Sequence, residues 1–179
     1  RAAGWVVDEV ETLPPIAEAA QLQITLWLGH DYSGKYAAAQ AEGDPGALRA
    51  LDGQGDFVRS LASDAIPLAL IRRAEITRAW NVFLQQYPIV LLPPSAELPF
   101  PDDLDLGTDE DYRRVWRAQM SMVGLPVTGL PALALASGET PDGAPLGIQM
   151  VASRFREDVL FDAAREIEAR SAPVTIAQI

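Results

Sequence analysis

His30 and Lys35 are the only histidine and the only lysine in this chain, and they lie close together. The segment between Gly29 and Tyr36 reads GHDYSGKY, which has the spacing of a phosphate-binding loop, G-x-x-x-x-G-K. Tyr36 stands where that loop needs a serine or threonine to bind magnesium. A phosphate-binding loop also follows a buried strand, whereas the residues before Gly29 have a helical pattern. We therefore predict a helix that ends near Gly29 and then a polar loop, without a nucleotide site.

A serine nucleophile needs a base that takes its proton, and N–H groups that stabilise the oxyanion. Ser33, Gly34 and Lys35 come nearest to this arrangement, but no cluster of glycines and serines accompanies them. His30 leaves little for a Ser-His-Asp triad, and we interpret it as a solvated loop residue. The absence of cysteine removes thiolate nucleophiles and cysteine-based metal sites. The sequence predicts no catalytic residue, cofactor or metal within the chain.

The densest acidic segment, from Asp102 to Asp111, reads DDLDLGTDED. It lacks the glycine position and the closing glutamate of a calcium loop. Thr108 or Asp109 is instead predicted to cap the next helix, whose first turn favours acidic side chains.

The overall composition limits the class of partner. The formal net charge of -11 at pH 7 repels nucleic acids and anionic membranes, so neither is predicted to bind. No run of about 18 apolar residues predicts a membrane span. The absence of cysteine fits a cytoplasmic protein. The 179 residues suffice for one domain with a sizeable core.

A strand, a turn, a second strand and a helix are predicted in the C-terminal third. Leu130 to Ser137 and Leu146 to Val151 are short apolar runs, and Asp142-Gly143 between them is a strong reversal signal. Such apolar strands need cover on both faces, so they indicate a layered α/β body. The helix is predicted from apolar residues at helical spacing: Leu160, Ala163, Ala164 and Ile167.

Four other elements are predicted in the N-terminal half. Gly4 to Val10 reads as a strand, and Pro14-Pro15 suits the start of a helix. Asp64 to Gln86 is the longest helical pattern, and Ile89 to Leu92 is a short buried strand after it. The apolar stripe of the first helix consists of Ile16, Ala20, Ile24, Trp27 and Leu28.

Two segments have less regular patterns. Residues 41–56 are rich in glycine and aspartate, and we predict a surface loop with one short helix around Ala47 to Leu51. Tyr112, Trp116 and Val123 share one face of a predicted helix that ends near Gly124.

Three motifs in order give the chain a resemblance. GLPA at residues 129–132, PLGIQMVA at 145–152 and RFRED at 154–158 resemble the C-terminal end of amidase signature enzymes. Many members of that family carry a proline near the end of the first strand, where this chain has Ala136 and Ser137. The combination of motifs is specific, although no single tripeptide in it is.

The resemblance implies an α/β fold in which residues 1–179 form the C-terminal segment of one amidase signature domain, with a mixed β-sheet layered with α-helices. It implies amide C–N hydrolysis by a Ser-cisSer-Lys mechanism, whose catalytic half is absent here, so that the chain alone is predicted to be inactive. Ser95, in a loop that borders the substrate pocket in the family, and Trp116 and Met120 are candidate pocket residues, with core packing the alternative for the last two. The implied partners are a small-molecule amide, the missing N-terminal half and a second copy in a homodimer.

A second hypothesis comes from another class of protein. The missing nucleophile and the acidic surface also fit a free-standing, non-enzymatic α/β domain that binds a partner protein. Such a domain would be monodisperse and melt cooperatively, whereas part of a larger fold would expose a wide apolar surface.

Overall fold

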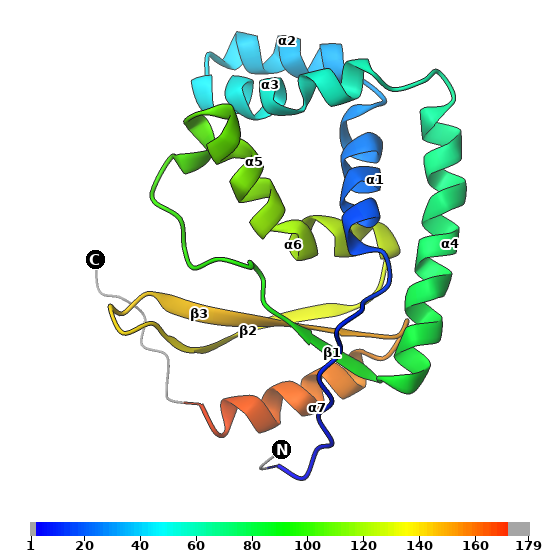
Figure 1. The fold of residues 1–179 in the computed structure, drawn as a ribbon, viewed down its shortest axis with the longest axis vertical. Helices are drawn as coiled ribbons and strands as arrows, with labels where there is room; N and C mark the ends of the chain where they lie inside the picture. The colour runs from blue at the N-terminus through cyan, green and yellow to red at the C-terminus, as the bar shows by residue number, and fades with distance from the viewer. Residues whose placement is uncertain (1–2, 172–179) are drawn as a thin grey trace.

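The structure, a computed structural model, describes residues 3–171 of the chain (Figure 1). The α/β class is confirmed: helices alternate with a small sheet of three strands in the described residues. The helices are α1 Ile16–Leu28, α2 Tyr32–Glu42, α3 Pro45–Arg59, α4 Ala65–Gln86, α5 Asp109–Ala118, α6 Met120–Gly124 and α7 Glu157–Glu168, with short 3-10 helices η1 Leu104–Leu106 and η2 Leu125–Thr128. The strands are β1 Ile89–Leu92, β2 Ala132–Glu139 and β3 Pro145–Ala152.

The sheet has the order β1-β3-β2, and both of its pairs are antiparallel. Helix α7 lies against one face, where Leu160 packs with Met150 and Leu133. On the opposite face, Val90 and Val151 pack with residues of α4. The predicted strand–turn–strand–helix unit is confirmed, because β2, β3 and α7 cover the expected residues.

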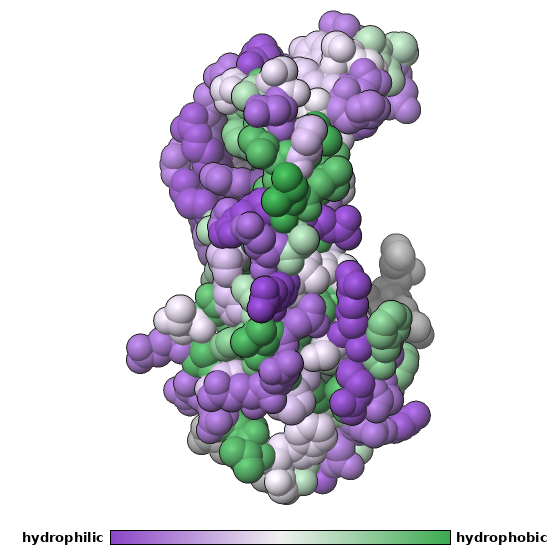
Figure 2. All heavy atoms as spheres, turned by 90° about the vertical axis from the view of Figure 1, so that its right-hand side faces the viewer, coloured by the Kyte–Doolittle hydropathy of each residue, from purple (hydrophilic) through white to green (hydrophobic). Residues whose placement is uncertain are grey.

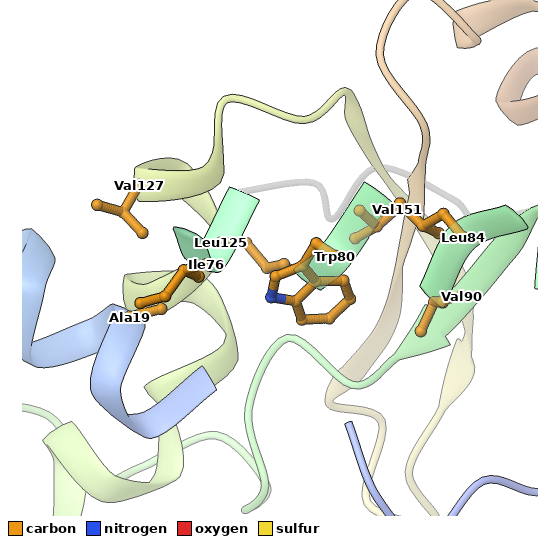
Figure 3. Packing of buried hydrophobic residues seen from close by; sticks show 8 residues of the cluster. All are labelled: Ala19, Ile76, Trp80, Leu84, Val90, Leu125, Val127 and Val151. Atoms are coloured by element: carbon orange, nitrogen blue, oxygen red, sulfur yellow. The ribbon is translucent and has the colours of Figure 1, made fainter. Parts of the chain in front are cut away.

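The core of the molecule lies between α4, α1 and the sheet (Figure 3). Trp80 and Ile76 of α4 are almost completely buried, as the helical spacing predicted. Ala19 of α1 lets α4 approach closely, because its side chain is small. The eight buried residues of this cluster are Ala19, Ile76, Trp80, Leu84, Val90, Leu125, Val127 and Val151.

Not every predicted apolar position is buried. Trp27, which the stripe of α1 placed in the core, is 48% exposed. On α4, Leu68, Ile71 and Val82 are also more than half exposed. Figure 2 shows the side of the molecule that carries α4, where hydrophobic groups lie among hydrophilic ones. Apolar residues therefore remain uncovered on this helix.

The prediction of a surface loop at residues 41–56 is wrong. Helix α2 runs to Glu42, Gly43 ends it in the left-handed conformation (φ 74°), and α3 begins directly after Asp44. The carboxylate of Asp44 accepts a hydrogen bond from the N–H of Gly46 at 2.8 Å and caps α3. The glycine and aspartate residues thus form two helix ends, and the helices make a hairpin at the top of Figure 1.

The predicted strand at Gly4 to Val10 is also wrong. The segment from Trp5 to Val10 has no regular secondary structure and is exposed, with Val6 at 90% exposure. An apolar run becomes a strand only when another strand pairs with it. None of the three strands pairs with these residues.

The predicted helix from Tyr112 to Gly124 is interrupted. Helix α5 ends at Ala118, and α6 starts at Met120 in a new direction. Gly124 ends α6 where the helix meets α1, and a Cβ there would lie 2.7 Å from the carbonyl oxygen of Ile16. The residue at this contact must therefore be glycine.

Candidate functional site

The segment around His30 and Lys35 is the end of one helix and the start of another. The carboxylate of Asp31 accepts a hydrogen bond from the N–H of Gly34 at 3.1 Å and caps α2. His30 and Lys35 are both exposed. The helical residues before Gly29 confirm that this is not a phosphate-binding loop, but the predicted polar loop is only three residues long because α2 begins at Tyr32.

Ser95, a predicted pocket residue, lies in the loop after β1. This loop is held against the α5–α6 break, because the N–H of Ala96 donates to the carbonyl oxygen of Ala118 at 2.8 Å. The hydroxyl of Ser121 donates to the carbonyl oxygens of Pro93 and Pro94 at 3.0 and 3.2 Å. The Ser95 hydroxyl itself accepts from the N–H of Glu97 at 3.2 Å. The tertiary structure therefore brings the Ser95 loop beside the segment that contains Met120.

Trp116 and Met120 are partly buried and pack on Ala20, Ile24 and Val123. This packing is the alternative that the sequence left open for them. Their packed sides face α1 and α3, whereas Ser95 lies on the other side of the α5–α6 break. The assignment of these three residues to a substrate pocket stays a prediction.

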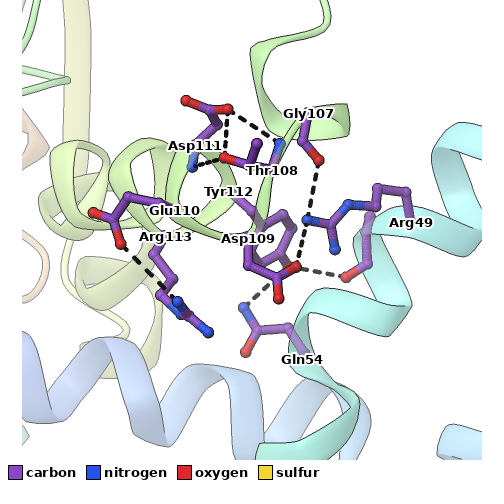
Figure 4. A network of polar contacts seen from close by, with 10 residues as sticks. Arg49, Gln54, Gly107, Thr108, Asp109, Glu110, Asp111, Tyr112 and Arg113 are labelled. Atoms are coloured by element: carbon purple, nitrogen blue, oxygen red, sulfur yellow. Dashed lines mark hydrogen bonds and ion pairs between the residues drawn. The ribbon is translucent and has the colours of Figure 1, made fainter.

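A polar network joins α3 to α5 (Figure 4). The Tyr112 hydroxyl donates to the carbonyl oxygen of Ala50 at 2.9 Å and accepts from the side chain of Gln54 at 3.1 Å. Arg49 pairs with Asp109 at 3.0 Å and lies over the Tyr112 ring. Burial raises the pKa of Tyr112 above its ordinary value of 10.0. This neutral, fully bonded phenol serves packing, and no local sequence signal indicated the network.

The charged side chains also form structural pairs. The guanidinium of Arg72 binds both carboxylate oxygens of Glu18, at 2.6 and 2.8 Å, and lowers the pKa of Glu18. Arg114 does the same to Glu97 across the α5 surface. A general acid that works near neutral pH needs the opposite shift, so neither carboxylate suits that role. Within residues 3–171, no group of three or more His, Asp or Glu residues is arranged to hold a metal ion.

The GLPA motif forms the junction of η2 and β2. Gly129 has the left-handed conformation (φ 63°), which most side chains disfavour. The guanidinium of Arg73 fixes this turn, because its Nε donates to the carbonyl oxygen of Val127 at 2.7 Å. The Thr128 hydroxyl donates to the carbonyl oxygen of Leu125 at 2.6 Å. The motif therefore sets the direction in which β2 leaves the helical layer.

An open trough of about 540 Å³ lies beside β2. Leu133 and Ala134 of the strand form one wall, and Leu160 and Phe161 of α7 form the other. Its lining is apolar except for Glu157, so it offers no catalytic group. Within the described residues, no helix is long and apolar enough to cross a membrane.

Comparison with known sequences relates the chain to a set of enzymes. A family model described as Amidase matches residues 40–161. Indoleacetamide hydrolase of Bradyrhizobium japonicum is 37% identical over 95 residues, which cover 52% of this chain and 20% of that relative. One of the glutamyl-tRNA(Gln) amidotransferase subunits of Clostridium acetobutylicum is 29% identical over 101 residues, covering 56% and 20%. The matched part of the chain thus spans about a fifth of these relatives.

Solved structures agree on the fold. The 6-aminohexanoate cyclic dimer hydrolase in complex with its substrate superposes with a TM-score of 0.63 at 17% identity, covering 96% of this chain and 39% of that one. The allophanate hydrolase of Kluyveromyces lactis gives a TM-score of 0.61 at 19% identity, covering 89% and 26%. At these identities the likeness concerns the fold alone.

Proposed function

The chain belongs to the amidase signature family, and from this premise we propose that it is the C-terminal part of an amidase, an enzyme that hydrolyses amide C–N bonds. Its contribution is scaffold and one wall of the substrate pocket, while a Ser-cisSer-Lys triad is supplied by residues outside it. The observation that carries this proposal is the combination of a family match over residues 40–161 with a lone lysine that is exposed on α2.

The environment of that lysine supports an inactive isolated chain. A lysine that relays protons in a serine amidase must be within hydrogen-bond reach of a serine and be partly desolvated, so that it loses its proton near neutral pH. Lys35 is exposed to water, and no serine hydroxyl binds it in the described residues. The chain therefore has no base for a serine nucleophile.

We propose a small-molecule carboxamide as the substrate class, with arylacetamides first. Two of the matched relatives are named indoleacetamide hydrolase, at 37% and 34% identity, which favours this class over glutamine. Hydrolysis would transfer the acyl group to a serine, release the amine and then release the acid by attack of water.

The test uses the complete polypeptide that contains this chain, assayed for ammonia release from indole-3-acetamide and from glutamine. We expect hydrolysis of the arylacetamide, and no turnover by residues 1–179 alone. Lys35→Ala and His30→Ala should leave kcat within about twofold, because both side chains are exposed and remote from any serine. A large loss of kcat in Lys35→Ala, with the fold intact, would contradict the proposal, as would amide hydrolysis by the isolated chain.

The free-standing partner-binding domain is distinguished by solution behaviour. Exposed apolar residues on α4, such as Leu68 and Ile71, should make the isolated chain bind a hydrophobic dye or aggregate. A monodisperse isolated chain that melts cooperatively, together with an inactive complete polypeptide, would favour the partner-binding domain instead.

A further inference from the structure

The outer edge of β2 has no partner strand in the described residues. The sheet order β1-β3-β2 leaves β2 at one end, so only one of its edges is hydrogen-bonded. Which backbone groups point outward follows from the register. The N–H of Ala152 donates to the carbonyl oxygen of Pro131, so in the alternating antiparallel pattern Leu133 and Leu135 bond to β3.

The residues between them face the other way. Ala132, Ala134 and Ala136 lie opposite Val151, Gln149 and Gly147 in the non-hydrogen-bonded pairs. Their N–H and C=O groups therefore point to the free edge. Their methyl side chains are exposed as well, so a neighbouring strand would meet little steric hindrance there.

Nothing in the composition of this edge discourages pairing. Natural edge strands are protected by lysine, proline, inward-pointing charges or a covering segment. From Ala132 to Gly138 the strand reads ALALASG, without a charge or a proline. The only irregularity in its pairing with β3 lies between Ala136 and Gly138. Such a strand is typical of the interior of a sheet.

The trough beside β2 indicates what kind of strand would pair. Leu160, Phe161 and Leu133 line it, and Phe161 is 54% exposed. A strand at the β2 edge would direct every second side chain toward α7 and into this trough. Those side chains must be apolar to match its walls, and their burial would cover Phe161.

We propose that β2 is an interior strand of a larger sheet, and that its free edge pairs with an extended apolar strand from the part of the amidase that lies outside this chain. The proposal rests on the proposed function. The source of the strand is indicated by chain length, because the solved hydrolase of the same fold is covered to only 39% while 96% of this chain is used.

The experiment is residue-resolved amide hydrogen exchange on the complete polypeptide. We expect the N–H groups of Ala132, Ala134 and Ala136 to exchange at least about tenfold more slowly than unstructured amides, as Leu133 and Leu135 do. Ala134→Pro removes one outward N–H without removing a bond to β3. It should restore rapid exchange at Ala132 and Ala136, while Leu133 and Leu135 stay protected.

Rapid exchange at the three alanines, beside slow exchange at Leu133 and Leu135, would overturn the proposal. Protection that arises only as the protein concentration rises would assign the edge to a second copy, and would overturn it too. Amide hydrolysis is assayed on the same sample. An active sample with a freely exchanging edge refutes this inference alone, and an inactive sample with a protected edge refutes the proposed function alone.

Discussion

Gly53 shows how a single residue determines the contact between two helices. It lies inside α3, and a Cβ at this position would be 2.3 Å from two atoms of the Tyr112 ring. Glycine usually weakens a helix, by about 0.5–1 kcal/mol relative to alanine. Here it lets the α5 tyrosine reach the backbone of α3 and bond to Ala50. The composition that indicated a loop therefore reflects close packing.

Gly53→Ala should lower the free energy of unfolding by about 1–3 kcal/mol, the usual cost of overpacking, despite the better helix propensity of alanine. Urea unfolding of the variant measures the effect. Gly138→Ala is the matched control, because its added Cβ meets nothing within 4 Å. If Gly53→Ala were as stable as Gly138→Ala, the tight contact with Tyr112 would be disproved.

At the scale of the elements, caps explain where the helices begin. Thr108 accepts a hydrogen bond from the N–H of Asp111 at 3.2 Å, and the Asp111 carboxylate accepts from the Thr108 N–H at 3.1 Å. This capping box starts α5, as the acidic segment predicted. The turn between β2 and β3 was likewise predicted, and Gly143 has φ 87° there.

Thr108→Ala should cost about 1 kcal/mol of stability, since it removes the acceptor for the Asp111 N–H. Chemical denaturation compares it with Ser33→Ala, which removes an exposed hydroxyl in the first turn of α2 that makes no hydrogen bond in the described residues. Equal stability of the two variants would show that the capping box contributes nothing measurable.

At the scale of the whole molecule, charge pairing determines the response to pH. The chain carries a net charge of -11, yet arginines bind Glu18, Glu97 and Asp158 and lower the pKa of each carboxyl. Asp111 and Asp142 also have lowered pKa values, mainly through the hydroxyls of Thr108 and Thr140. Ionised carboxylates are thus part of the folded state.

A carboxyl whose pKa is lowered by folding contributes stability above its unfolded pKa, and this contribution is lost as the pH falls through the folded value. The unfolded values are 4.5 for Glu and 3.8 for Asp. We therefore expect the free energy of unfolding to decrease as the pH falls below about 4.5.

The measurement is urea unfolding between pH 7 and pH 3 at about 0.15 M salt, which screens the general repulsion of the acidic surface. Arg72→Gln should make the decrease shallower, and Arg78→Gln, which has no carboxylate partner in the described residues, should not. A rise in stability on acidification would mean that relief of the net negative charge outweighs these pairs.

The sequence by itself determined the elements whose signals are local. The β2–β3 hairpin, α7, α4 and the cap of α5 follow from periodicity, turn residues and caps, each of which acts within a few residues. The order of the GLPA, PLGIQMVA and RFRED motifs was enough to indicate the family, which the match over residues 40–161 confirms.

Only the tertiary structure decided the features that depend on distant partners. Glycines in α3 read as a loop until Tyr112 is seen against them, and Gly4 to Val10 reads as a strand although no strand in the described residues pairs with it. The break after Ala118 likewise follows from the packing of α6 on α1. The physical reason is that burial and strand pairing depend on contacts between residues far apart in the chain, which local patterns do not record.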